Sequence, residues 1–183
     1  TTFPVTGPSS KAVRFTIGSN RAWGIGLLPL GWAKFVGKPA SDYADALIDG
    51  HSDPAFADFR VLSDTLFGDV PDTDAELARI TAYFSARVGD PVPDEARIMA
   101  IHAALVDPET ATVAQLVEHS GISQRSVERV CRRAFGFPPK LLLRRQRFMR
   151  SPCLILRSNG SAQWMATITI RRNSCAIAAA FWG

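Results

Sequence analysis

The most regular alternation of apolar and polar positions lies in residues 112–150. Its first part repeats apolar residues at the three- and four-residue spacing of one helix face: Val113, Leu116 and Val117. Thr112 and Gln115 have the spacing of a capping box, in which each side chain satisfies a backbone group at the start of a helix. Gly121 follows where a tight interhelical turn favours a residue that tolerates positive φ. The pattern predicts a short helix followed by a sharp turn.

A second amphipathic helix is predicted over residues 124–135. Ile122 is expected to fill the angle between the two helices, and Ser123 stands at the N-cap position. The expected buried face consists of Val127, Val130, Cys131 and Ala134. The expected outward face consists of Arg125, Glu128, Arg129 and Arg132. Two short helices joined in this way are typical of a helix-turn-helix, whose second helix enters the major groove of DNA.

Beyond this helix, Gly136 is predicted to end the second helix, and Pro138 and Pro139 suit the first turn of another. The residues expected to pack this third helix are Leu141, Leu142, Leu143 and Phe148. Its arginines are Arg144, Arg145, Arg147 and Arg150. Because they are too many to be buried together, we expect some to hold phosphate and at least one to form an internal salt bridge.

Residues 1–88 combine strand and helix patterns. Val13–Ile17 and Ala22–Leu27 are short runs rich in β-branched and aromatic residues, and they predict a hairpin or two adjacent strands. Gly24 and Gly26 within the second run indicate a bulge or a close backbone approach. Helices are expected to begin at Pro29, Ser41, Asp53 and Thr73, the last with a capping box to Glu76 and an end near Val88.

A Gly-Asp-Pro-Val-Pro sequence at residues 89–93 interrupts the helical pattern and is expected to be a linker. Asp94 is then predicted to cap a helix that runs to about Val106. The expected order is an N-terminal region over 1–88, a helix-turn-helix domain over 94–150 and an atypical tail over 151–183. The fold class is therefore expected to be α+β, with a small strand-containing N-terminal region followed by a mainly α-helical domain.

The net charge changes sign at this linker. Residues 1–93 carry a net charge of −3, and residues 94–183 carry +7. Within residues 124–150, one lysine and eight arginines stand against Glu128 alone. Phosphate attracts such a surface through counterion release, and the excess of arginine favours nucleic acid because guanidinium pairs bidentately with phosphate and guanine. For any single residue of this surface, a solvated helix face is the alternative.

The composition indicates a globular protein, since 46% of the residues are hydrophobic and 21% are charged. No apolar run approaches the ~18–20 residues of a membrane span, and no signal segment is recognisable. The three cysteines form no CxxC pair, which suits a reducing cytoplasm. The scattered histidines make no ligand set, so we expect no metal site. We also expect no catalytic residue and no cofactor. Because the chain starts at Thr1, we interpret it as a fragment or a trimmed chain.

These motifs resemble the AraC/XylS family of bacterial transcription regulators over residues 113–150. Ser123 to Arg129, Gly136 with Pro139, and Arg147 stand at the spacing of that family's first helix-turn-helix. Cys131 and Leu142 depart from the family pattern, which usually has phenylalanine and tyrosine there, but both are apolar. The resemblance implies a sequence-specific DNA-binding transcription regulator and not an enzyme.

The expected DNA-contacting residues combine the charge pattern with this resemblance. They are Ser123, Gln124, Arg125, Ser126, Glu128, Arg129, Arg132, Arg133, Lys140, Arg144 and Arg145. The resemblance implies that three of them read bases: Arg125, Glu128 and Arg129.

The resemblance also implies partners and a location. Residues 23–46 resemble the sensor half of a subgroup in this family, which implies an N-terminal regulatory region that lacks its first strands and answers to an unidentified small-molecule effector. The expected partners are double-stranded DNA and RNA polymerase, and the expected location is the bacterial cytoplasm, in association with the nucleoid. Two alternatives are a DNA-repair methyl acceptor fused to a helix-turn-helix, and a domain that binds proteins through its apolar tail. Cys153 lacks the following histidine and arginine that the methyl acceptor would need.

The family normally carries a second helix-turn-helix, and residues 151–183 show no pattern for one. Thr167–Ile170 predicts a strand instead, and Ala176–Trp182 is an apolar segment. Permissible codons for residues 158–183, read one frame over, give QRLRAVDGDHYDPAQFVRDCRRFLG, whose second half resembles the missing unit. We therefore hypothesise that a frameshift near Ser151 and Pro152 replaced the native C-terminus.

This hypothesis predicts that the gene contains, near codon 151, a position at which a one-base insertion or deletion restores the second helix-turn-helix. The nucleotide sequence of this region, translated in all frames, tests it. If no one-base change restores that reading, the hypothesis fails.

Overall fold

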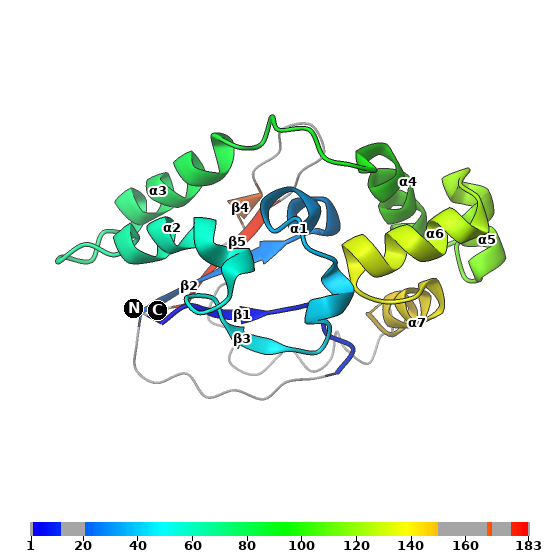
Figure 1. The fold of residues 1–183 in the computed structure, drawn as a ribbon, viewed down its shortest axis with the longest axis horizontal. Coiled ribbons are helices and arrows are strands. Elements are labelled where there is room, and N and C mark those ends of the chain that lie inside the picture. Colours follow the sequence, from blue (N-terminus) through cyan, green and yellow to red (C-terminus); the bar gives the residue numbers. More distant parts are fainter. Residues whose placement is uncertain (1, 12–20, 150–167, 170–176, 183) are drawn as a thin grey trace.

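The computed structural model describes residues 2–11, 21–149, 168–169 and 177–182, and it mixes α-helices with short antiparallel strands (Figure 1). The strands are β1 (Pro4–Thr6), β2 (Ala22–Leu27), β3 (Leu47–Asp49), β4 (Ile168–Thr169) and β5 (Ile177–Trp182). The α-helices are α1 (Pro29–Phe35), α2 (Arg60–Thr65), α3 (Thr73–Ser85), α4 (Glu95–Val106), α5 (Val113–Ser120), α6 (Gln124–Val130) and α7 (Pro139–Met149). Three further helical segments are not α-helical. The 3-10 helices η1 (Ala40–Tyr43) and η2 (Pro54–Phe59) are wound more tightly than an α-helix, and the π-helix η3 (Cys131–Phe135) is wound more widely.

The strands form two small antiparallel sheets. In the first, β1 pairs with β3; in the second, β2 pairs with β5, which pairs in turn with β4. The strand predicted over Ala22–Leu27 is confirmed as β2, and its pairing with β5 runs without a bulge, so that Gly24 lies opposite Ala180. The strand and the apolar segment predicted in the tail correspond to β4 and β5. The run Val13–Ile17 lies outside the described residues.

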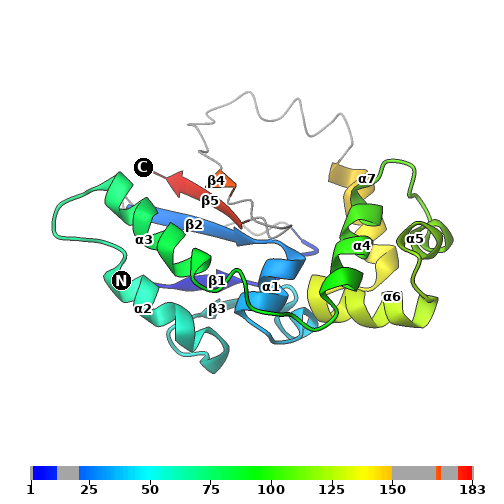
Figure 2. The same ribbon diagram turned by 90° about the horizontal axis from the view of Figure 1, so that it is seen from above.

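The helices α4 to α7 gather at one end of the molecule in both ribbon views (Figures 1 and 2). We call residues 95–149, which contain these helices and η3, the helical head. The strands, α2 and α3 lie toward the other end, and α1 lies between the two groups. Within the part of the chain that the structure describes, no helix is long and apolar enough to cross a membrane.

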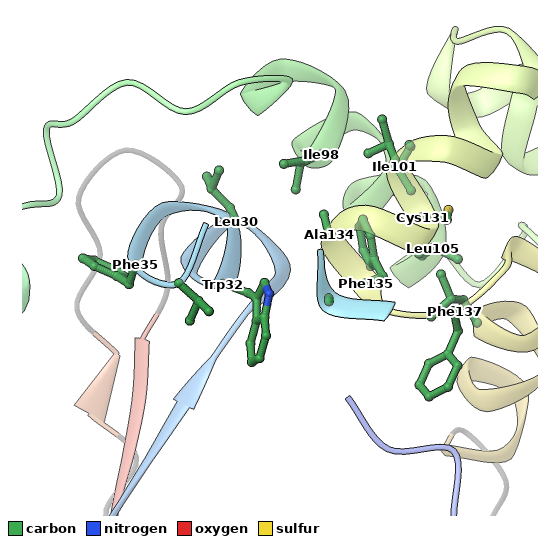
Figure 3. Packing of buried hydrophobic residues seen from close by; sticks show 14 of the residues in the cluster. Leu30, Trp32, Phe35, Ile98, Ile101, Leu105, Cys131, Ala134, Phe135 and Phe137 are labelled. Atoms are coloured by element: carbon green, nitrogen blue, oxygen red, sulfur yellow. The ribbon is translucent and has the colours of Figure 1, made fainter. Parts of the chain in front are cut away.

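One cluster of buried apolar side chains runs from α1 into the helical head. Helix α1 contacts both α4 and η3, and η1 contacts η3 as well. Figure 3 shows side chains of this cluster on three elements: Leu30 and Trp32 on α1, Ile98 on α4 and Phe135 on η3. Because each fully buried side chain of this size stabilises the fold by ~1.5–3 kcal/mol, this contact fixes how the N-terminal elements meet the head.

An aromatic cluster packs the N-terminal elements among themselves. Phe56 is buried at its centre, with its ring centroid 6.0 Å from that of Trp32 and 5.6 Å from that of Tyr43, both in edge-to-face or tilted arrangements. Phe3, which precedes β1, lies 6.4 Å from the same ring. Edge-to-face pairs place the positive edge of one ring against the negative face of another, which adds to the stabilisation from burial.

The predicted capping box at Thr73 and Glu76 is wrong by one residue. Asp72 is the N-cap, and its carboxylate accepts a hydrogen bond from the backbone N–H of Ala75 at 2.9 Å. The register change turns Glu76 toward β2, where it is buried, accepts a hydrogen bond from Trp23 Nε1 at 2.7 Å and pairs with Arg21 at 3.0 Å. Glu76 therefore joins α3 to β2 instead of capping the helix.

Three other predicted helix ends also differ from the structure. Helix α3 ends at Ser85, three residues before Val88. Ser41 does not cap the next turn, because η1 begins at Ala40 and shows no side-chain cap. Asp94 precedes α4, but its backbone is left-handed, with φ of 63°, and its carboxylate makes no cap hydrogen bond. The helix start at Asp53, by contrast, is confirmed by a cap bond to Ala55 of 2.8 Å.

Gly136 offers a test of how the N-terminal segment meets the head. Its φ is +83°, and a Cβ there would lie 2.7 Å from Pro8 Cγ, whereas Gly121 has φ of +66° with open space around it. Gly121→Ala is expected to cost about 1–2 kcal/mol of unfolding free energy through backbone strain alone. Gly136→Ala is expected to cost ~1–3 kcal/mol more, because Pro8 must also move.

Urea denaturation of both variants beside the wild type measures this difference. Equal losses of stability in Gly136→Ala and Gly121→Ala would contradict the contact between Pro8 and Gly136.

Candidate nucleic-acid interface

The predicted capping box and turn of the helix-turn-helix are confirmed. Thr112 Oγ1 accepts a hydrogen bond from the backbone N–H of Gln115 at 3.2 Å, and Gln115 Oε1 accepts one from the backbone N–H of Thr112 at 3.0 Å. Gly121 is left-handed, as a short turn between two helices requires. These local features fix the angle at which α6 leaves α5.

The apolar face of the second helix is buried as predicted. Val127 and Cys131 have no exposed surface, and Val130 and Ala134 are almost fully covered. Burial raises the pKa of the Cys131 thiol to about 12, so the side chain stays protonated at neutral pH. Cys131 is therefore a small packing residue and not a nucleophile.

The second helix has the predicted extent but changes its winding. Helix α6 ends at Val130 and continues as η3, a π-helical turn, to Gly136, whose φ is +83°. A π-helical turn contains more residues than an α-helical one, so it shifts the direction of the side chains that follow. No residue pattern in the sequence indicates this change.

The outward face of α6 and η3 is exposed as predicted. Arg125, Glu128, Arg129 and Arg132 all lie at the surface. Gln124 Nε2 donates to Glu128 Oε1 at 3.3 Å. Ser123 occupies the N-cap position, but its hydroxyl donates to Ser126 Oγ at 3.1 Å and does not cap the helix. The side chains at the start of α6 therefore bond to one another and not to the backbone.

Arg129 differs from the other arginines of this face because a carboxylate holds it. Its two terminal nitrogens donate to Asp94, NH1 to Oδ2 at 2.8 Å and NH2 to Oδ1 at 3.3 Å. Arg97 donates to the same carboxylate at 2.6 Å. The hydrogen bonds from Arg129 and then Arg97 lower the pKa of Asp94 to about 2, so this carboxylate is charged at neutral pH.

The remaining predicted cations of the head lie at the surface. They are Arg133, Lys140, Arg144 and Arg145. The Arg145 guanidinium lies 5.9 Å from the centroid of the Phe137 ring, a cation–π distance. Among the described residues, no ion pair with a carboxylate is found for Arg144, Arg145 or Arg147. Arg150 lies outside the described residues, so the internal salt bridge expected for at least one of the four arginines stays a prediction.

Phe148 corrects the predicted packing of α7. Leu142 and Leu143 are buried, but Phe148 is 65% exposed. At 100° per residue, Phe148 lies about 140° around the helix from Leu143 and shares a face with Leu141, which is half-buried. The helix therefore packs through a narrower face than the sequence suggested.

A small cleft lies where the N-terminal elements meet the head. Its volume is about 100 Å³. Its polar lining comes from Lys38, after α1, from Asp94, before α4, and from Arg133 in η3. Among the described residues, no three His, Cys, Asp or Glu side chains gather as they would around a metal ion.

Comparison with known proteins found no matching family model, no matching curated protein and no matching solved structure.

The pKa of Asp94 reports on its ion pair with Arg129. Arg129→Ala is expected to raise this pKa from about 2 toward its ordinary value of 3.8, while Arg97 maintains part of the shift. Because the folded-state pKa is lowered, the wild-type carboxylate stabilises the fold above pH 3.8, and this contribution is lost as the pH falls toward 2. Carboxyl-carbon NMR across an acid titration measures the change.

The matched control is Arg87→Ala, which removes a half-buried arginine that pairs with Asp58 at 3.3 Å, away from the head. The same Asp94 titration curve in both variants would contradict the ion pair.

Proposed function

We propose that this chain binds duplex DNA in a sequence-specific manner and regulates transcription, with α6 and η3 in the major groove. The observation that carries the proposal is the two-sided character of this helix. Its arginine-rich face is exposed directly after a tight interhelical turn, and its opposite face is buried in the head. A recognition helix needs both properties, because packing must hold it rigidly while its free face contacts base edges.

The length of the exposed face fits a short stretch of DNA. Arg125 and Arg132 are seven residues apart, which corresponds to about 10 Å along a helix axis. Successive base pairs are spaced by ~3.4 Å, so this face spans about three of them. Both guanidinium groups can donate bidentately to guanine or to phosphate.

The other residues of the interface have complementary roles in this proposal. Glu128 accepts from the exocyclic amine of cytosine, and Gln124, which it already bonds, reaches a base edge or phosphate. The cations on η3 and α7 hold the phosphate backbone and set the register of the helix: Arg133, Lys140, Arg144 and Arg145. The binding is therefore expected to weaken steeply with salt.

The resemblance to AraC/XylS regulators supports the same proposal. In that family two reading units contact successive major grooves, and this chain carries the pattern of one. Each lost base contact removes ~1–3 kcal/mol, so we expect micromolar, salt-sensitive binding. The corresponding partners are RNA polymerase and an unidentified effector, and the corresponding location is the bacterial cytoplasm.

Replacement of Arg125 by alanine is expected to weaken DNA binding about tenfold, because it removes one bidentate contact worth ~1–3 kcal/mol. Fluorescence anisotropy of a labelled duplex of random sequence, at low and moderate salt, measures the affinity. Arg125→Ala is also expected to flatten the dependence of affinity on salt concentration, since fewer counterions are released.

Arg87→Ala is the control, because it removes one positive charge from the segment between α3 and α4, outside the helical head. Equal affinities of Arg125→Ala, Arg87→Ala and the wild type, or no binding by the wild type at low salt, would refute the proposed function.

A further inference from the structure

The ion pair between Arg129 and Asp94 occupies the donors that DNA recognition would use. Asp94 accepts from both terminal nitrogens of the guanidinium, at 2.8 and 3.3 Å. This is the bidentate geometry in which arginine binds phosphate or the O6 and N7 atoms of guanine. The same two N–H groups cannot donate to Asp94 and to DNA at once. Arg129 is thus the one predicted base-reading arginine that the described structure holds in an ion pair.

Asp94 accepts these hydrogen bonds instead of capping α4, which is the role expected from its position before the helix. A residue before a helix usually has an extended backbone and caps the helix with its side chain. Asp94 instead has φ of 63° and ψ of 17° and makes no cap bond. Few residues other than glycine adopt this left-handed region, and the carboxylate of Asp94 reaches across to Arg129 of α6. Arg97 also donates to Oδ1 of this carboxylate, at 2.6 Å.

The N-terminal elements hold the segment that carries Asp94. Lys34 of α1 donates to the backbone carbonyl of Val88 at 2.7 Å and also to that of Asp90. The cleft of about 100 Å³ beside Asp94 is lined by the end of α1, by the linker and by η3. A shift of α1 relative to the head therefore moves the linker, and with it the carboxylate that binds Arg129.

We propose that Asp94 is an internal competitor of DNA for Arg129, and that the packing of α1 against the linker sets how often the pair is open. This inference rests on the proposed function, since it concerns the same DNA-binding face. When Asp94 is engaged, α6 presents one cation fewer to DNA and a carboxylate beside it. When the pair opens, Arg129 joins Arg125 and Arg132 on the reading face.

Removal of the Asp94 carboxylate is expected to tighten DNA binding. Asp94→Asn keeps the side-chain shape, and asparagine tolerates left-handed backbone. Asp94→Gly removes the backbone strain as well, so at least one of the two variants is expected to fold like the wild type. The full chain carrying either change is expected to bind a labelled random-sequence duplex about fivefold more tightly than the wild type at low salt, measured by fluorescence anisotropy.

Two controls separate release of Arg129 from the simple loss of a negative charge. Glu95→Gln removes the same charge one residue further along and is expected to change the affinity less than twofold, as a rough limit for a rim charge. The double variant that combines Arg129→Ala with Asp94→Asn is expected to show no gain in DNA affinity, because Arg129, the residue that would be released, is absent. Circular dichroism spectra of all variants check that the fold is retained.

The outcomes distinguish this inference from the proposed function. A gain in DNA affinity in Asp94→Asn that is absent from Glu95→Gln and from the double variant supports competition between Asp94 and DNA for Arg129. Unchanged DNA affinity in Asp94→Asn and Asp94→Gly, or a gain in affinity that persists without Arg129, overturns the competition. DNA binding by the wild type that is weakened in Arg125→Ala leaves the proposed function intact in that case. Absence of binding by the wild type and by every Asp94 variant overturns both.

Discussion

The apolar face of α6 and η3 can be buried only if helices cover it on more than one side. Helix α4 covers the first part, and α1 with η1 covers the π-helical part, so the head depends on residues far away in the sequence. Val127 and Cys131 show the result, since neither retains any exposed surface. The exposure of the opposite, arginine-bearing face follows from this constraint, because a helix with one face fixed has no freedom to turn the other away from solvent.

Local chemistry made parts of this fold predictable from the sequence. The capping box at Thr112, the left-handed turns at Gly121 and Gly136 and the buried stripe of α6 each depend on residues within one or two turns of each other. Where short-range preferences agree with the packing, a pattern in the sequence is enough. The strand at Ala22–Leu27 was predictable for the same reason, although its pairing with β5 was not.

Two of the predictions that failed involve side chains with more than one possible partner. Glu76 had the spacing of a capping box, but the Trp23 indole and the Arg21 guanidinium bind it instead. Asp94 had the position of a cap, but two arginines bind its carboxylate. A charged group in a partly buried place gains more from a charged partner than from one backbone N–H, and such a partner is visible only once the chain has folded. The π-helical turn at Cys131–Phe135 has no signal in the sequence at all.

Lys34 donates to the carbonyl of Val88, just before the linker, and to that of Asp90 within it, so the linker is not a free tether. Asp94 is thereby kept near Arg129 at an effective concentration on the order of millimolar or above, as for any short connection. Dilution of the protein does not alter this effective concentration. Dissolved anions at lower concentrations would compete poorly with it. A polymer with one charge per ~1.7 Å of its axis presents a much denser array of anions to the same surface. In the proposed competition, an internal carboxylate of this kind would act as a threshold, which a charged polymer would pass and isolated phosphates would not.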